Sequence, residues 1–125
     1  MSDYESGLRT RREVLGDAHV QRAGDAAGAF GQPFQEFITT YAWGAVWSRP
    51  GLDRRMRSAI TLAALVSVRA ENELAMHVRA ALRNGLSPDE IREVLLHTAV
   101  YAGVPAANSA FAIARQVLEE AGELG

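Results

Sequence analysis

Residues 70–102 read AENELAMHVRAALRNGLSPDEIREVLLHTAVYA. The centre of this stretch, GLSPDE, carries four helix boundary signals in a row. Gly85 can end one helix, Ser87 can cap the next, Pro88 suits its first position, and Glu90 completes a capping box with Ser87. The stretch therefore predicts two helices joined by a short connection, one before Gly85 and one after Ser87.

The second of these helices, expected from Pro88 to Ala102, is apolar on more than one side. The opposite side carries Leu96, Val100 and Tyr101 among its polar residues. A helix that is apolar on most sides has something packed against both faces. In a chain of 125 residues we expect the second surface to be another subunit, which predicts an obligate homo-oligomer. The main apolar stripe consists of Ile91, Val94, Leu95, Thr98, Ala99 and Ala102.

Outside this stretch the chain also favours helices. No segment combines strict apolar alternation with the turn dipeptides of hairpins, so we expect an all-α fold of about six helices. We expect a flexible N-terminal tail over residues 1–6 and one helical domain over residues 7–122. The other expected helical segments are 7–23 with a break at Gly16, 33–48 introduced by Gly31 and Pro33, 53–69, and 106–120 after Gly103 and Pro105.

Composition excludes several classes of function. The chain has 125 residues, 48% of them hydrophobic, which suits one domain with a real core. Its formal net charge of −2 gives no indication of a nucleic-acid partner. There is no cysteine, which excludes thiol redox chemistry and disulfides, and all 13 basic residues are arginine, which excludes a lysine Schiff base.

The sequence also predicts where the protein works. Its first residues, MSDYESGLRTRREVLGD, are polar and charged, unlike a secretory signal, so we expect a cytoplasmic protein. The most apolar run, residues 58–68, is far shorter than the roughly 20 residues of a membrane-spanning helix. We therefore expect a buried helix there and no membrane partner.

Two pairs of residues could carry acid–base chemistry. Glu73 and His77 lie four positions apart, so on a helix they share a face, where the carboxylate can orient and charge-tune the imidazole. A solvent-facing ion pair is the alternative. Glu93 and His97 repeat the spacing on a helix expected to be buried, where a histidine bonded to a backbone carbonyl is the structural alternative.

Neither pair fits a known metal or cofactor motif. The spacing is one residue longer than the Glu-x-x-His of carboxylate-bridged bundles, and HExxH is absent, so we expect no metal. Phosphate-binding glycine loops and a GxSxG elbow are absent as well, and we expect no cofactor. Trp43 and Trp47 share a helical face and could line an apolar pocket or pack in a core.

Four segments resemble one known family in order and spacing: RSAITLAAL (57–65), ELAMHVRAALRNGL (73–86), SPDEIREVLLH (87–97) and YAGVPAANSAFA (101–112). Together they are similar to the carboxymuconolactone decarboxylase family over about residues 10 to 120. That family shares its all-helical fold with the alkylhydroperoxidase D-like proteins, whose redox branch carries CxxCxxxH. Here Ala70 and Glu73 stand at the cysteine positions and His77 at the histidine, so the peroxidase chemistry is lost.

The resemblance implies an activity and roles for particular residues. It implies cofactor-free conversion of 4-carboxymuconolactone, a dicarboxylate lactone, to 3-oxoadipate enol-lactone and CO₂ in the protocatechuate branch of the β-ketoadipate pathway. In that reading His77 donates the proton and Glu73 sets its tautomer and charge. Arg57, the arginine before SAITLAAL, anchors the substrate carboxylate, although an ion pair to Glu73 or Glu93 is its structural alternative.

Three further residues complete the implied site. His97 would supply the oxyanion donor or a second proton relay, while Trp47 and Tyr101 would wall the pocket against water. The resemblance also implies a trimer-based assembly, with a hexamer as the expected form.

Other functions stay open at this point. A paralogue could use the same pocket on another lactone or β-keto-acid-like substrate. The chain could also be a non-catalytic helical oligomer that binds a small acid or a partner. Nucleic-acid binding would require Arg49, Arg54, Arg55 and Arg57 to form an exposed stripe.

Overall fold

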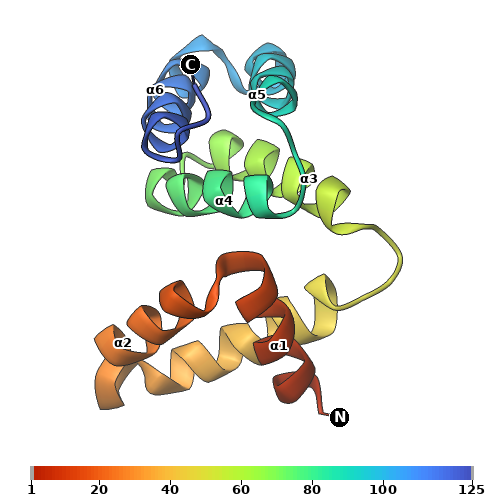
Figure 1. The fold of residues 1–125 in the computed structure, drawn as a ribbon, viewed down its shortest axis with the longest axis vertical. Coiled ribbons are helices and arrows are strands. Elements are labelled where there is room, and N and C mark those ends of the chain that lie inside the picture. The colour runs from red at the N-terminus through yellow and green to blue at the C-terminus, as the bar shows by residue number, and fades with distance from the viewer. Residues whose placement is uncertain (1, 125) are drawn as a thin grey trace. The chain divides into compact units, whose positions relative to one another are not determined.

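The computed structural model describes residues 2–124, which form six α-helices and one π-helical segment with no strand among them (Figure 1). The predicted all-α class is confirmed. The chain divides into two compact units, unit 1 (Met1–Asp53) and unit 2 (Arg54–Gly125). The elements in order are α1 (Asp3–Leu15), α2 (Asp17–Ile38), η1 (Thr39–Trp47), α3 (Arg54–Ser67), α4 (Glu71–Arg83), α5 (Pro88–Ala102) and α6 (Val104–Glu120).

Unit 1 begins with a helix earlier than the sequence suggested. Helix α1 starts at Asp3, because the Ser2 hydroxyl accepts a hydrogen bond from the Glu5 backbone N–H, as an N-cap does. The segment expected to be a tail is therefore helical from its third residue. The predicted break at Gly16 is confirmed: its φ of 91° lies in the left-handed region, which glycine tolerates.

The second helix of unit 1 folds back on itself at Gly28. This residue has φ 58° and ψ −164°, so α2 consists of two arms that meet at a sharp kink (Figure 1). The break expected at Gly31 and Pro33 was misplaced, because Gly28 takes the positive φ and Pro33 lies inside the second arm. Side chains of the first arm consequently face the same pocket as side chains of the second.

The second arm continues into the π-helical segment η1, which crosses α1 at very short range. A Cβ atom built on Gly7 would lie 2.0 Å from the carbonyl oxygen of Thr39, and one built on Gly44 would lie 2.1 Å from that of Asp3. Both backbones therefore meet directly, with no room for a side chain. The predicted helix over 33–48 is present, but the wider π turn of its second half was not foreseen.

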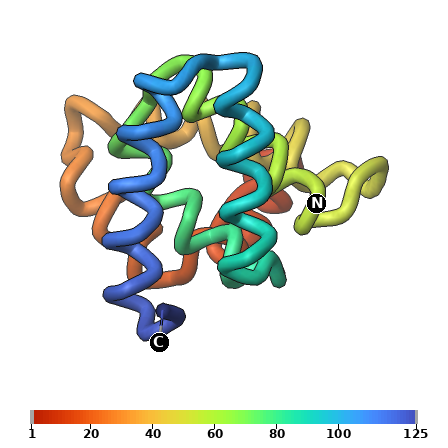
Figure 2. The backbone as a smooth tube through the Cα atoms, turned by 90° about the horizontal axis from the view of Figure 1, so that it is seen from above, coloured from red at the N-terminus to blue at the C-terminus, as the bar shows by residue number. Residues whose placement is uncertain are grey.

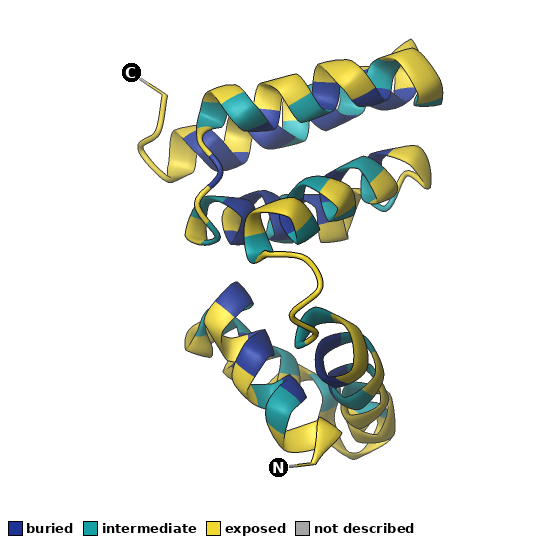
Figure 3. Cartoon of the chain, turned by 90° about the vertical axis from the view of Figure 1, so that its right-hand side faces the viewer, coloured by how far each residue is buried: buried dark blue, intermediate teal, exposed yellow. Residues whose placement is uncertain are grey.

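Unit 2 is built from α3, α4, α5 and α6 around one apolar core. Figure 3 shows the buried positions facing inward between these helices, and Figure 2 shows α5 and α6 running side by side. This core holds the helix that carries His77. The core residues are Leu62, Val66, Leu74, Val78, Ala81, Leu86, Ile91, Leu95, Ala106, Ala110, Ala114, Val117 and Leu118.

The predicted connection between α4 and α5 is confirmed in detail. The Ser87 hydroxyl accepts from the Glu90 N–H at 3.1 Å, and the Glu90 carboxylate accepts from the Ser87 N–H at 2.9 Å, which completes the capping box. Pro88 occupies the first turn as expected. Arg55 of α3 donates to the Gly85 carbonyl oxygen and to the Glu90 carboxylate, so it ties this connection to α3.

Helix α5 is buried on one side only within the single chain. Ile91, Leu95 and Thr98 pack inward, whereas Val100 and Tyr101 are 76% and 80% exposed. The helices of unit 2 cover one stripe of α5, and the covering of its other face by another subunit stays a prediction. Its outer face remains an uncovered apolar surface.

Candidate functional site

His77 is the buried centre of the candidate site. It lies in the middle of α4 with only 8% of its surface exposed, and its Nδ1 atom is shielded from solvent. Its helical neighbours Leu74, Val78 and Ala81 belong to the core of unit 2, which fixes the face on which His77 lies. An imidazole held in such surroundings meets a lower dielectric than in water, which strengthens any interaction with charge on a substrate.

Glu73 lies one turn before His77 but in a different environment. It is in the first turn of α4, where a carboxylate interacts favourably with the helix dipole, and its side chain is exposed. Immediately before this turn, Arg69 adopts a φ of 59°, a left-handed conformation that is uncommon for a residue with a side chain. Glu73 and His77, four residues apart on α4, therefore differ in environment: the histidine is buried and the carboxylate is exposed to solvent.

Arg57 is half-buried in the first turn of α3, with its Nε shielded from solvent. Helix α3 packs against α4, so Arg57 and His77 belong to adjacent helices of the same core. Its sequence neighbour Ser58 is buried and accepts a hydrogen bond at 2.8 Å from Asn84 at the end of α4. Sequence reasoning missed this bond between α3 and α4, although Ser58 lies within the motif RSAITLAAL.

His97 and Tyr101 form a second, exposed group on α5. Their ring centroids lie 5.5 Å apart with the planes tilted by 39°. Both side chains are exposed, and so is Glu93 one turn earlier, whose carboxylate lies 3.7 Å from the Nε of Arg92. In the single chain His97 therefore faces outward, and its predicted burial would require the other subunit expected at α5. Its outward position follows from the stripe that α5 presents to the core.

Trp47 belongs to unit 1, at the end of η1. It is half-buried, and its ring lies 4.9 Å from that of Trp43, centroid to centroid. Ser48, which follows it, closes the segment by donating to the Trp43 carbonyl oxygen at 2.7 Å. The structure therefore places Trp47 in a local aromatic pair with Trp43.

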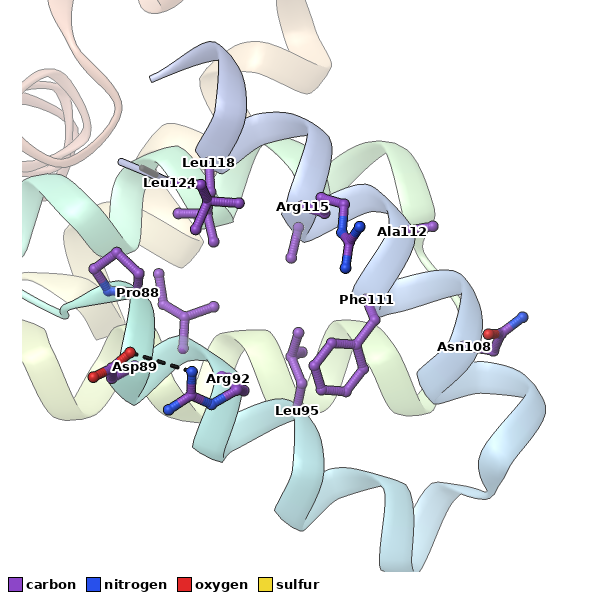
Figure 4. A pocket seen from close by; sticks show the side chains of 12 residues that line it. Pro88, Asp89, Arg92, Leu95, Asn108, Phe111, Ala112, Arg115, Leu118 and Leu124 are labelled. Carbon is purple, nitrogen blue, oxygen red and sulfur yellow. Dashed lines mark ion pairs between the residues drawn. The ribbon is translucent and has the colours of Figure 1, made fainter. Parts of the chain in front are cut away.

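A pocket of about 530 Å³ lies between α5 and α6 (Figure 4). Leu95 and Phe111 form part of its wall, and Arg92 and Arg115 reach its rim, the former paired with Asp89 at 3.2 Å. None of the six predicted site residues lines it. The pocket is thus separate from both groups described above.

Residues 2–124 hold neither a metal-binding cluster nor a membrane-spanning helix. Across residues 2–124 no cluster of three or more histidine, aspartate and glutamate side chains is placed to hold a metal ion. In the same range no helix has the length and apolar character needed to cross a bilayer.

Comparison with known proteins assigns the chain to a family. The model of the carboxymuconolactone decarboxylase family matches residues 32–116. A 4-carboxymuconolactone decarboxylase of Acinetobacter baylyi is 48% identical over 119 residues, which cover 95% of this chain and 89% of that protein. Nitrosuccinic acid decarboxylase npaB of Metarhizium robertsii is 42% identical over 117 residues, which cover 94% of this chain and 82% of that protein. These similarities extend over both units, and the chain belongs to the carboxymuconolactone decarboxylase family.

Proposed function

We propose that this protein decarboxylates 4-carboxymuconolactone to 3-oxoadipate enol-lactone without a cofactor. The observation that carries the proposal is the 48% identity, over nearly the whole chain, to a protein named for that activity. The burial of His77 at the motif position supports it. The substrate would be a small dicarboxylate lactone, and the proposed setting is the cytoplasm.

The reaction defines what the protein must supply. The carboxylate that leaves is bonded to a ring carbon separated from the lactone carbonyl by one double bond. When that carbon–carbon bond breaks, its electron pair moves through the double bond to the carbonyl oxygen, and CO₂ leaves with a dienolate behind it. A proton then adds to the ring carbon beside the carbonyl. The site therefore needs a carboxylate anchor, a donor to the developing oxyanion, and a proton source.

We assign the proton source to His77. Imidazole titrates near neutral pH, so it can hold and release a proton under physiological conditions. The burial of His77 limits competing exchange with water, and Glu73 on the same helix face would favour the charged imidazolium through its negative charge. General acids in such positions typically contribute about 10² to 10⁴ in rate.

We propose that Arg57 binds the carboxylate by which the substrate is anchored. A planar guanidinium presents paired N–H donors that match a carboxylate, and Arg57 lies half-buried on the helix next to that of His77. His97, on α5, would donate to the oxyanion or relay a proton. Trp47 and Tyr101 would exclude water from the site. These roles follow the family motif.

We also propose a homo-oligomer, trimer-based and expected as a hexamer. The support is the apolar outer face of α5 and the start of α6, where Leu96, Val100, Tyr101 and Val104 are all exposed in the single chain. Covering these side chains with another copy would remove apolar surface from water. Because His97 and Tyr101 lie on this helix, assembly would also enclose two of the assigned site residues.

A second candidate substrate follows from another relative. The 42% identical protein from Metarhizium robertsii is named for nitrosuccinic acid, so a related substrate with an electron-withdrawing group near the leaving carboxylate is the alternative. A nitro group would accept the electron pair as the lactone carbonyl does. The chemical requirements on the protein would be the same.

One experiment separates these possibilities. Purified protein is incubated with 4-carboxymuconolactone in deuterated water without added metal or cofactor, and NMR follows substrate loss and deuterium placement. Stoichiometric enol-lactone with deuterium beside the carbonyl is the expected result. Absence of turnover by folded, oligomeric protein would contradict the proposal, and turnover of nitrosuccinic acid in a parallel sample would support the alternative.

A further inference from the structure

Unit 1 contains a buried arginine that the proposed reaction does not use. Arg11 of α1 is only 6% exposed. Its Nη1 donates to the Thr39 hydroxyl at 3.2 Å, and its Nη2 donates to the Gln35 side-chain oxygen at 2.9 Å. Its Nε is buried and makes no hydrogen bond within the described chain. The guanidinium thus donates to two neutral acceptors, and its Nε–H has no acceptor among the described residues.

Such an arrangement leaves a buried positive charge with no carboxylate bonded to it, since among the described residues both hydrogen-bond partners of Arg11 are uncharged. Burial lowers the pKa of the Arg11 guanidinium, and the nearby Tyr4 opposes that shift, but arginine stays protonated at any physiological pH. A buried charge is costly unless an opposite charge balances it. An anion beside Arg11 would therefore be held strongly.

A pocket of about 220 Å³ opens beside Arg11, between α1 and the two arms of α2. Arg12 supplies a second cation on its wall. Among the described residues that line it, Glu36 is the only acid, and the Glu36 carboxylate already accepts a hydrogen bond from Gln32 at 3.1 Å. The lining therefore carries an excess of one positive charge.

We propose that this pocket of unit 1 binds a small carboxylate through Arg11 and Arg12. A guanidinium edge matches the two oxygens of a carboxylate in one plane, and the apolar side chains of Leu8 and Val20 suit the short carbon chain attached to it. The volume fits a small organic acid better than a nucleotide or a drug-sized ligand. The site lies within unit 1 and does not depend on the decarboxylation proposed above.

The test is a titration of the full-length protein followed by backbone amide NMR. Succinate is the probe, inorganic phosphate is the second oxyanion, and sodium chloride at equal ionic strength is the control for screening. Saturable shifts of amides around Arg11 and Thr39 with succinate are the expected result. The absence of such shifts would overturn the proposal, and phosphate binding as tightly as succinate would overturn the assignment to carboxylates.

Substitutions test whether succinate binds in this pocket. Arg11→Gln should weaken succinate at least about tenfold, since loss of one charge-assisted contact is worth about that factor. Arg9→Gln is the matched control, because Arg9 lies exposed on the same helix and outside the pocket. Equal affinities in these two variants would overturn the proposal. If Arg11→Gln does not fold, Gln21→Glu is the second test: it adds a competing carboxylate at an exposed lining position and should also weaken succinate binding.

The result is independent of the catalytic proposal. The titration measures binding and no turnover, and its probes are not lactones. Failure of this experiment would leave the decarboxylase assignment unchanged, and failure of the turnover experiment would leave the carboxylate site of unit 1 unchanged.

Discussion

Arg55 and Glu90 form an ion pair that joins α3 to the capping box at the start of α5. The same guanidinium donates to the Gly85 carbonyl oxygen, which belongs to the turn after α4. One arginine thus connects three helices of unit 2 at the connection that the sequence GLSPDE specifies. This brings the end of the helix carrying His77 into the same hydrogen-bond network as the capping box.

This ion pair predicts a pH-dependent contribution to stability. The hydrogen bond from Arg55, followed by that from the Ser87 backbone, lowers the pKa of Glu90 below its ordinary value. A carboxyl group whose folded pKa is depressed stabilises the fold above its unfolded pKa, and that contribution is lost as pH falls through the folded pKa. Glu90→Gln should therefore lower the thermal midpoint at pH 7, and its difference from wild type should shrink in acid.

The measurement is thermal unfolding of both proteins from pH 7 downward. Glu119→Gln serves as the control. Glu119 is an exposed carboxylate of the same unit, near the C-terminal end of α6. A difference between Glu90→Gln and wild type that stays constant into strong acid would contradict the ion-pair explanation.

The crossing of α1 and η1 predicts a sharp contrast between two glycines. Gly44→Ala would place a methyl group 2.1 Å from the Asp3 carbonyl oxygen, so the backbones must separate, at a cost of about 1–3 kcal/mol for overpacking. Gly24→Ala, also within a helix, meets no atom within 4 Å and should stabilise by about 0.4–1 kcal/mol. Denaturant unfolding followed by circular dichroism gives both values, and equal effects would contradict the close crossing.

Local signals predicted unit 2 better than unit 1. The connection 85–90 was predictable because each residue in it has one preferred local role, from the positive φ of Gly85 to the capping box of Ser87 and Glu90. In unit 1 both Gly28 and Gly31 could take a positive φ, and the local sequence does not indicate that Gly28 is the one that does. The close approach of η1 to α1 likewise requires the missing side chain of Gly7, more than thirty residues earlier in the chain.

For the candidate site, the sequence predicted which residues share a helix face but not which of their side chains are buried. The four-residue spacing placed Glu73 and His77 on one helix face, but which of them is buried depends on the core beneath α4. The exposure of His97 could not be read from the local sequence either, since α5 is apolar on two sides and the fold alone decides which side packs inward. The uncharged hydrogen-bond partners of Arg11, Gln35 and Thr39, lie far along the chain from it.

The assignment of His77 predicts a large loss of activity without a loss of fold. His77→Gln keeps a polar side chain of similar length but cannot act as an acid near neutral pH, so kcat should fall at least about a hundredfold. Circular dichroism and the oligomeric state should match wild type. His97→Gln is the comparison variant. Glutamine can also donate a hydrogen bond to the oxyanion, so kcat should fall far less than in His77→Gln. A nearly unchanged kcat in His77→Gln would remove His77 from the mechanism.

The assignment of Arg57 predicts a different kinetic signature. Arg57→Lys keeps the charge but loses the planar pair of donors, so the apparent KM should rise by about tenfold while kcat changes little if the contact is equal in ground and transition states. Arg9→Lys, an exposed change in unit 1, is the control. Unfolding of Arg57→Lys, with no change in KM of the folded fraction, would instead support a structural ion pair.

The apolar outer face of α5 predicts that assembly depends on Val100. Val100 and Val68 are similarly exposed in the single chain, at 76% and 72%, but Val100 lies beside Tyr101 and Leu96 on α5, whereas Val68 follows the end of α3. A charge placed within a buried interface is costly, so Val100→Asp should reduce the oligomer to smaller species in light scattering coupled to size exclusion. Val68→Asp should leave the oligomer intact. Dissociation by both variants, or by neither, would show that α5 does not form the contact between copies.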